Sequence, residues 1–336
     1  MSEVITRIEH GIGRITLNRP QALHALTTQM CADIDAALTA WENDTAVTAV
    51  LVDHAEGTRG FCAGGDIRKV AQSGRTDGVE AREFFAVEYT MNARIKRFTK
   101  PYIAIIDGIT MGGGVGLSVH GSHRIATERT VFAMPETGIG LFPDVGGGWF
   151  LPRLDGELGT WLALTGAQLR GSDVVAAGIA THFVPMDRID ALKADITAID
   201  RYAEAVPPAA YTKHMDTINR CFGHDTMTAI SIALNSGDDW AREQAQILTK
   251  RSPQSLAVSL RQLREGRKLD SFEDVMRMEY RIASRITSTK DFSEGVRAVI
   301  EDKDQAPVWA ELTEGAIEAF FQSLGNMDLQ FPDIST

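Results

Sequence analysis

The chain has 336 residues, of which 44% are hydrophobic and 24% are charged, the composition of an ordinary globular protein. No run of about 18 apolar residues is present that could cross a bilayer, so a membrane protein is not expected. The formal net charge of −11 disfavours binding to nucleic acid phosphates, which requires concentrated Lys and Arg. At about 150 residues per domain, the length predicts two domains, or one large domain with an appendage.

The opening residues and the cysteines indicate the compartment. The segment from Met1 to Arg7 lacks the basic and apolar regions of an export signal and the Arg-rich composition of a transit peptide, so a cytoplasmic location is expected. Cys31, Cys62 and Cys221 are odd in number and contain no Cys-x-x-Cys pair. This argues against a disulfide framework and a structural zinc site, and it fits a reducing compartment.

The first half of the chain alternates between expected strands and expected helices. Glycine turns follow several of the strands, and this order predicts an α/β layer whose ligand site lies beyond the strand ends. The expected strands are residues 3–18 (two strands around a turn at 10–13), 48–53, 101–107 and 124–134, and the expected helices are residues 28–41, 79–98 and 112–120.

From about residue 187 the pattern becomes almost wholly helical. The expected helices are residues 189–205, 227–235, 308–324, and one that begins at Ser252-Pro253, with Ser as the cap and Pro in the first turn. We therefore predict a core domain at residues 1–186 and a helical C-terminal region at residues 187–336. Neither part shows a tandem repeat or a low-complexity tract.

Two glycine clusters that follow expected strands are candidates for binding a ligand oxygen. Gly112–Gly114 opens a helix whose bare N–H groups could stabilise a developing negative charge, and close helix-to-sheet packing explains the glycines equally well. Gly64 and Gly65 could supply a second N–H beside the first, or could form only a tight turn. Neither cluster has the spacing of a dinucleotide-binding or phosphate-binding loop, so those sites are not expected.

Glu136 and Asp144 are the first candidates for an acid, a base or a nucleophile. Glu136 directly follows the apolar residues 131–135, and a carboxylate kept from water is usually tolerated where it does chemistry. Asp144 lies eight positions later, across two glycines and a proline that allow the loop to fold back on itself. The structural alternatives are a salt bridge or cap contact for Glu136 and a helix N-cap role for Asp144.

The remaining candidate groups favour no metal and no other nucleophile. The eight histidines include no His-Glu-x-x-His and no cluster of metal-ligand spacing, and His120 and His123 are interpreted as structural. Cys62 would need a base nearby, and a packed, inert thiol fits its small neighbours better. No Gly-x-Ser-x-Gly segment is present to supply a serine nucleophile.

Taken together, these motifs resemble the crotonase (enoyl-CoA hydratase/isomerase) superfamily, and within it most closely the 3-hydroxyisobutyryl-CoA hydrolases. The resemblance covers nearly the whole chain. The segments that carry it are Leu17–Leu23, Phe61–Arg68, Met111–Val119, Phe132–Thr137 and Phe150–Leu154, with a C-terminal signature like that of the hydrolase branch at Asp291–Ala298, Asp302–Asp304 and Trp309.

The fold implied by the resemblance is an α/β spiral of repeated ββα turns, followed by a helical region that contributes to oligomer contacts in many relatives. Gly65 and Gly113 match the positions whose N–H groups form the oxyanion hole for a thioester carbonyl. Ala63, Gly65 and Ile67 match the loop that cradles the adenine end of coenzyme A. Coenzyme A would be part of the substrate, so no separate cofactor is expected, and a homo-oligomer is one option for the assembly.

The resemblance also implies an acyl site, because Glu88 matches an acyl-pocket position and Glu136 and Asp144 match the catalytic pair of the hydrolases. The implied reaction is hydrolysis of 3-hydroxyisobutyryl-CoA, a step of valine catabolism.

Two positions depart from the family pattern. Hydratases need a glutamate three positions after the central glycine of the triplet, and here that position is Gly116. A smaller departure is His24, where Asn is usual. The alternatives are a hydratase or isomerase on the same scaffold and a CoA-ester binding protein without catalysis.

Overall fold

A computed structural model describes residues 2–313 and 315–331 of the chain. The chain forms two compact units, and each unit is built from three separate segments. Unit 1 contains the chain up to Gly65, Arg94–Ala133 and Gln168–Thr212, and unit 2 contains Asp66–Ala93, Met134–Ala167 and the chain from Lys213 onward. The division of the sequence into residues 1–186 and 187–336 stays a prediction.

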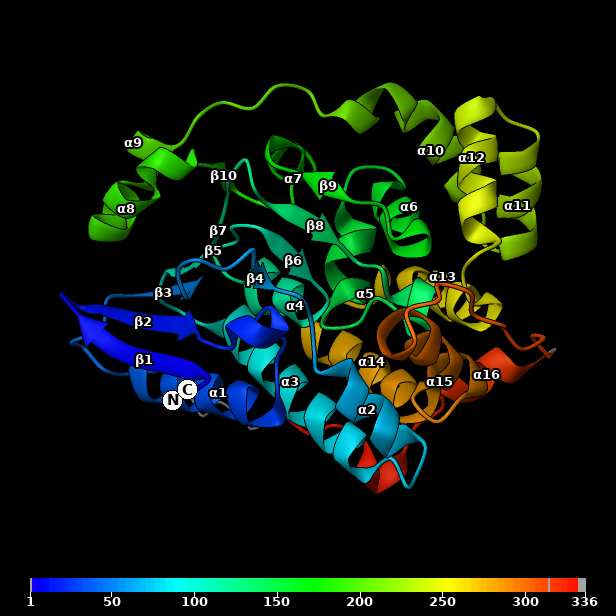
Figure 1. The fold of residues 1–336 in the computed structure, drawn as a ribbon, viewed down its shortest axis with the longest axis horizontal. Helices are drawn as coiled ribbons and strands as arrows, with labels where there is room; N and C mark the ends of the chain where they lie inside the picture. The colour runs from blue at the N-terminus through cyan, green and yellow to red at the C-terminus, as the bar shows by residue number, and fades with distance from the viewer. Residues whose placement is uncertain (1, 314, 332–336) are drawn as a thin grey trace. The chain divides into compact units, whose positions relative to one another are not determined.

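Unit 1 contains the two β-sheets of the described residues (Figure 1). The β1–β2 and β8–β9 pairs are antiparallel, and the other neighbouring strands are parallel. The six-stranded sheet has the order β1 (Val4–Glu9), β2 (Ile12–Leu17), β3 (Ala49–His54), β5 (Tyr102–Ile105), β7 (His123–Ala126) and β10 (His182–Phe183). The four-stranded sheet has the order β4 (Gly60–Cys62), β6 (Ile109–Met111), β8 (Val131–Ala133) and β9 (Leu169–Arg170).

Successive strands alternate between these two sheets. β3 of the larger sheet is followed by β4 of the smaller one, β5 is followed by β6, and β7 by β8. Helices separate the strand pairs in the sequence, with α2 (Ile67–Gly74) and α3 (Val79–Arg97) after β4 and α4 (Gly113–Val119) after β6. Repeated strand–strand–helix units of this kind form the expected ββα spiral, so the fold class predicted from the resemblance is confirmed.

The single strand expected at residues 124–134 is wrong, because the segment contributes β7 and β8 to different sheets. A polar turn separates them: the Thr127 N–H donates to Thr130 Oγ1 at 2.8 Å, and the Thr130 N–H donates to the Thr127 carbonyl at 3.1 Å. Asp107 accepts a hydrogen bond from the Thr127 hydroxyl and pairs with Arg129. These side chains satisfy the turn backbone, whereas the apolar residues on either side suggested one continuous strand.

The larger sheet buries its alternating apolar residues against the helices that follow β10. Leu51, Ile103 and Ile105 share one hydrophobic cluster with Ile189 and Leu192. The expected helix at 189–205 is wrong, because it is divided into α8, a 3-10 turn and α9, and Asp195, which ends α8, accepts a hydrogen bond from the Thr197 hydroxyl. The other helices of unit 1 and its borders are η1 (Pro20–Ala22), α1 (Thr28–Glu42), α7 (Ser172–Ala176), α8 (Met186–Ala194), η4 (Ile196–Ala198), α9 (Ile199–Tyr202) and η5 (Ala210–His214).

Unit 2 consists mainly of helices, including α2 and most of α3. The predicted start at Ser252-Pro253 is confirmed, since the Ser252 hydroxyl accepts a hydrogen bond from the Ser255 N–H at 3.0 Å. No helix within the described part of the chain is long and apolar enough to cross a membrane. The other helices are η2 (Glu136–Ile139), α5 (Gly147–Phe150), η3 (Leu151–Arg153), α6 (Leu158–Thr165), α10 (Met215–Phe222), α11 (Met227–Asn235), α12 (Asp239–Leu248), α13 (Pro253–Gly266), α14 (Phe272–Ile286), α15 (Lys290–Val296), a π-helical turn (Arg297–Glu301), α16 (Ala316–Phe321) and η7 (Gly325–Met327).

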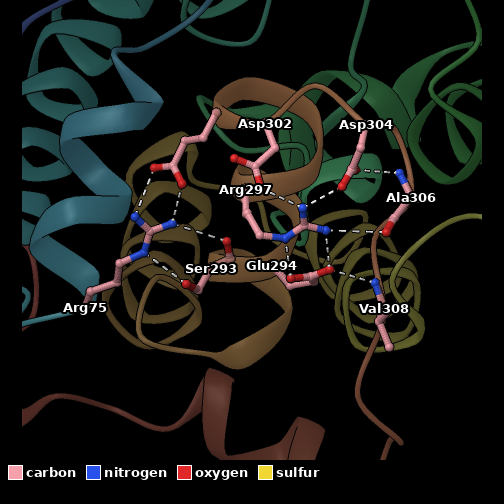
Figure 2. Close-up of polar contacts among 9 residues, drawn as sticks. Arg75, Ser293, Glu294, Arg297, Asp302, Asp304, Ala306 and Val308 are labelled. Carbon is pink, nitrogen blue, oxygen red and sulfur yellow. Dashed lines mark hydrogen bonds and ion pairs between the residues drawn. The ribbon is translucent and has the colours of Figure 1, made fainter.

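The C-terminal signature forms an ion-pair cluster around Arg297 (Figure 2). Its guanidinium donates to both oxygens of Glu294 at 2.8 and 2.9 Å, and to Asp302 and Asp304 at 2.8 and 2.6 Å. Glu294 also accepts a hydrogen bond from the Val308 N–H at 2.9 Å. The helix expected at residues 308–324 is therefore wrong at its start, because side-chain carboxylates hold this backbone, and α16 is the only helical part among the described residues of that range.

Replacing Arg297 by Gln should make the stability of the protein less sensitive to acid. The Arg297 hydrogen bonds lower the pKa of Glu294 from 4.5 to about 2, so this carboxylate stabilises the fold above pH 4.5, and the contribution is lost as the pH falls toward 2. Urea unfolding at about pH 5 and pH 3 should show a smaller loss in Arg297→Gln than in wild type. Arg242→Gln, which breaks an exposed pair with Asp239, should behave as wild type, and equal losses in all three proteins would contradict the assignment.

Candidate functional site

The loop that follows β4 in unit 1 is fixed by the segment just before α1. The Ala63 N–H donates to the Leu23 carbonyl at 3.0 Å, and the Leu26 N–H donates to the Gly64 carbonyl at 2.8 Å. Leu26 and Gly65 form an isolated parallel bridge. Gly64 has a φ of +113°, which side chains of L-residues rarely adopt, so a glycine is required at this position.

The glycine triplet of unit 1 opens α4 and packs tightly against β4. Gly112 caps the helix with φ +46° and ψ −120°, a conformation that favours glycine. A Cβ added to Gly114 would lie 2.4 Å from the Cys62 carbonyl oxygen, so this glycine serves close packing. A Cβ added to Gly64 would lie 3.8 Å from the Gly113 nitrogen, and the two glycine loops are therefore neighbours.

The N–H groups of Gly65 and Gly113 donate no hydrogen bond to another group among the described residues. Gly113 is the first residue of α4, where a backbone N–H has no acceptor within the helix. Two such donors on neighbouring loops can bind an oxygen that gains negative charge. Both interpretations of the glycine triplet therefore apply. Gly114 is needed for close packing, and the Gly113 N–H is available to bind a ligand oxygen.

In unit 2, Glu136 and Asp144 are both buried, with 5% of each residue exposed. Glu136 begins η2, and its Oε2 has no hydrogen-bond partner among the described residues. Burial raises the pKa of Glu136 well above its ordinary value, and the negative charge of Asp144 raises it further. The charge of Asp144 therefore lies close enough to Glu136 to disfavour the ionised form of Glu136.

Asp144 accepts a hydrogen bond from the Tyr89 hydroxyl at 2.8 Å. Burial raises the pKa of Asp144 to about 7, although this hydrogen bond acts in the opposite direction. The N-cap of α5 is Gly146, so the alternative role of Asp144 as a helix cap is wrong. A carboxyl group with this pKa can accept or donate a proton near neutral pH.

Glu88 precedes Tyr89 on α3 and is also buried, with 2% of the residue exposed. Its Oε1 lacks a hydrogen-bond partner among the described residues. Burial raises the pKa of Glu88 well above its ordinary value, and the Asp144 charge adds to the shift. Ile67, the remaining predicted position in this unit, is the first residue of α2 and is partly exposed.

Sequence reasoning missed Glu279, which is fully buried on α14. Its Oε2 accepts a hydrogen bond from the Gly146 N–H at 2.7 Å, and its Oε1 accepts one from the Gly148 N–H at 2.8 Å. Burial raises the pKa of Glu279 to about 8, while these two amides lower it. The sequence could have predicted that Glu279 is buried, because it lies on the same helix face as the apolar residues Val275 and Ile282.

The other candidate side chains lie in structural environments. Cys62 is fully buried, and its thiol donates to the His24 carbonyl at 3.2 Å. His24, the departure from the usual Asn, accepts a hydrogen bond from the Arg19 N–H at 2.9 Å, and burial lowers its pKa to about 4. Within the described residues, no three His, Cys, Asp or Glu side chains are grouped as metal ligands.

Comparison with known proteins identifies close relatives. The model of the enoyl-CoA hydratase/isomerase family matches residues 12–321. The mitochondrial 3-hydroxyisobutyryl-CoA hydrolase of Xenopus laevis is 47% identical over 341 residues, which cover 95% of this chain and 88% of that protein. The human protein of the same name is 45% identical over 352 residues, which cover 98% of this chain and 91% of that protein.

Two solved structures share the fold over nearly the entire chain. A carnitinyl-CoA dehydratase from Mycobacterium thermoresistibile is 41% identical with a TM-score of 0.93, and the match covers 99% of this chain and 100% of that one. An enoyl-CoA hydratase from Rhodobacter sphaeroides 2.4.1 is 39% identical with a TM-score of 0.91, covering 98% of this chain and 100% of that one.

The cytoplasmic location expected from the opening residues is wrong in the light of these relatives. The hydrolases from Xenopus laevis, Rattus norvegicus and Homo sapiens are all named as mitochondrial proteins. An opening segment without a recognisable signal is only negative evidence, and the expectation followed from it by default.

Removing the Tyr89 hydroxyl should raise the pKa of Asp144 above its value of about 7, because the Tyr89 hydrogen bond stabilises the ionised carboxylate. Carbon-13 NMR titration of Tyr89→Phe, with labelled aspartate, measures this shift. Tyr102→Phe is the matched control, since it removes a buried hydroxyl that donates to the Leu117 carbonyl. An unchanged or lower pKa in Tyr89→Phe would show that the hydrogen bond does not act on Asp144.

Proposed function

Because the chain belongs to the enoyl-CoA hydratase/isomerase family, we propose that it is a thioester hydrolase that converts 3-hydroxyisobutyryl-CoA and water to 3-hydroxyisobutyrate and coenzyme A. The relatives that are 45–47% identical over most of the chain bear this activity in their names. Within the structure, the observation that supports the proposal is the buried pair of Glu136 and Asp144. Two interacting carboxyl groups can divide the roles of base and acid between them.

The thioester carbonyl would be polarised by the N–H groups of Gly65 and Gly113, which have no acceptor among the described residues. As the carbonyl carbon is attacked, negative charge moves to its oxygen, and each backbone donor aimed at that oxygen typically lowers the barrier by about 3 kcal/mol.

Glu136 would either remove a proton from the attacking water or attack the carbonyl itself to form a mixed anhydride. In both routes the C–S bond breaks and the thiolate takes a proton, which Asp144 would supply. The negative charge of Asp144 raises the pKa of Glu136, so the mechanism requires the state in which Asp144 holds the proton and Glu136 is ionised. In that state Glu136 is the base or nucleophile and Asp144 is the acid. When Glu136 activates water, the proton that it gains restores Asp144. In the anhydride route, a water molecule then cleaves the anhydride to release 3-hydroxyisobutyrate and Glu136, and a proton of this water restores Asp144.

The remaining predicted residues would bind the substrate. Glu88, whose burial favours the protonated form, would line the acyl pocket. Asp144 would also contact the substrate hydroxyl. Ala63 and Ile67, with Gly65, would hold the adenine end of coenzyme A, which enters as part of the substrate.

A hydratase is the second candidate, because the two structural relatives are named as a dehydratase and a hydratase. Adding water to a double bond in this family requires two glutamates, and the first of the two positions is Gly116 here. This residue is buried in α4 and has no side chain to hold a water molecule. We therefore expect negligible hydration of crotonyl-CoA alongside rapid thiol release from 3-hydroxyisobutyryl-CoA, and the opposite result would favour the hydratase.

Glu136→Gln should lower kcat for thiol release by about 10²- to 10⁴-fold or more, because the amide is neither a base nor a nucleophile. Inhibition by free coenzyme A should remain nearly unchanged, since Glu136 acts at the acyl end. The exposed substitution Glu265→Gln should keep wild-type activity. An active Glu136→Gln enzyme would refute the assignment, and absence of thiol release from the wild type would favour a CoA-ester binding protein without catalysis.

A further inference from the structure

The backbone that carries Asp144 is strained directly after this residue. Val145 has a φ of +50° and Gly146 a φ of +85°, so two successive residues lie in the left-handed region. Glycine adopts this region readily, but a β-branched residue does not. Such a conformation persists only where surrounding groups hold it, and Val145 is fully buried.

Glu279 supplies contacts that hold this turn. Its two carboxyl oxygens accept hydrogen bonds from the Gly146 and Gly148 N–H groups at 2.7 and 2.8 Å. A Cβ added to Gly148 would lie only 3.1 Å from Glu279 Oε1, so the missing side chain lets the carboxyl group approach the backbone. Both bonds lie within unit 2, to which α14 and the turn belong.

Gln262 of α13 extends this support to the other side of Asp144. Its Nε2 donates to the Pro143 carbonyl at 2.7 Å and to Glu279 Oε1 at 2.9 Å. Helix α13 also packs directly on the turn, because a Cβ added to Gly266 would lie 2.1 Å from the Gly148 carbonyl oxygen. The backbone is therefore tied immediately before and two residues after Asp144.

We propose that Glu279 is a positioning residue for thioester hydrolysis, and that its carboxyl group holds the strained 144–148 turn so that Asp144 faces Tyr89 and its partner acid. This inference rests on the proposed function for its catalytic consequence. It assigns the C-terminal helices a direct part in the acid site, whereas the sequence suggested only a role in oligomer contacts.

The hydrogen-bond pattern explains why this position requires a carboxyl group. Three donors, the N–H groups of Gly146 and Gly148 and Nε2 of Gln262, point at two oxygens of Glu279. Gln has the same shape but only one acceptor oxygen, so its NH₂ group would face a backbone N–H. Asp keeps two acceptor oxygens and is one methylene shorter. If Glu279 only fills space, Gln should therefore be the better-tolerated replacement. If Glu279 acts by accepting hydrogen bonds, Asp should be the better-tolerated replacement.

The test compares Glu279→Gln and Glu279→Asp in the full-length protein. We expect kcat for thiol release to fall about 10- to 100-fold in Glu279→Gln, the scale of loss from a small misplacement of a catalytic group, and to fall less in Glu279→Asp. The inhibition constant for free coenzyme A should not change. Asp291→Asn is the control for lost stability, because Asp291 also accepts a backbone hydrogen bond, from Ala310 at 2.7 Å.

Wild-type kcat in Glu279→Gln, or a larger loss in Glu279→Asp than in the isosteric Gln variant, would overturn the proposal. A loss matched by Asp291→Asn at equal thermal stability would also overturn it. The carbon-13 carboxyl shift of Asp144 separates this result from failure of the proposed function. If the wild type releases no thiol but the Asp144 signal shifts in Glu279→Gln, the proposed function is wrong and the positioning of Asp144 by Glu279 is supported. If the Asp144 signal does not shift, the positioning role is wrong as well.

Discussion

The main physical constraint on the candidate site is that unit 2 keeps several carboxyl groups out of water. Glu88, Glu136, Asp144 and Glu279 are each at most 5% exposed. An isolated buried charge costs far more free energy than one protein interaction returns, so such groups must share protons, accept hydrogen bonds or lose their charge. Here Asp144 and Glu279 accept hydrogen bonds, and burial raises the pKa values of all four acids above their ordinary range.

The hydrogen bonds within this group assign different roles to similar side chains. Glu279 is surrounded by N–H donors and has no free oxygen to offer a substrate, whereas Glu136 and Glu88 each keep an oxygen without a partner among the described residues. Asp144 lies between these extremes, with one bond from Tyr89. Burial alone would not separate them, and the local donors determine which acid supports the backbone and which is available for proton transfer.

Much of the site was predictable from the sequence, but only where the signal is local. Glu136 and Asp144 stand out because they interrupt apolar, glycine-rich segments, and the roles of Gly65 and Gly113 came from the family resemblance. Glu279 was missed because the backbone N–H groups that it binds lie more than 130 positions earlier in the chain. Its position on an apolar helix face predicts that the side chain is buried, but it does not predict which backbone groups the carboxyl group binds.

The fold class was likewise predictable, and the errors share one cause. The expected strand at 124–134 is interrupted by a turn that Thr127 and Thr130 satisfy, and the expected helix at 308–324 is displaced by contacts to Glu294 and Asp291. In both places side chains satisfy the backbone groups that a regular element would otherwise pair. Hydrophobic periodicity does not report such competition.

The most direct test of this account is the protonation state of the buried glutamates at neutral pH. Infrared difference spectroscopy of protein with carbon-13-labelled glutamate side chains should show a carboxylic acid band that persists near pH 7 and weakens in Glu88→Gln, because burial favours the protonated form of Glu88. Titration of every glutamate near the ordinary pKa of about 4.3, with no such band at neutral pH, would contradict the account.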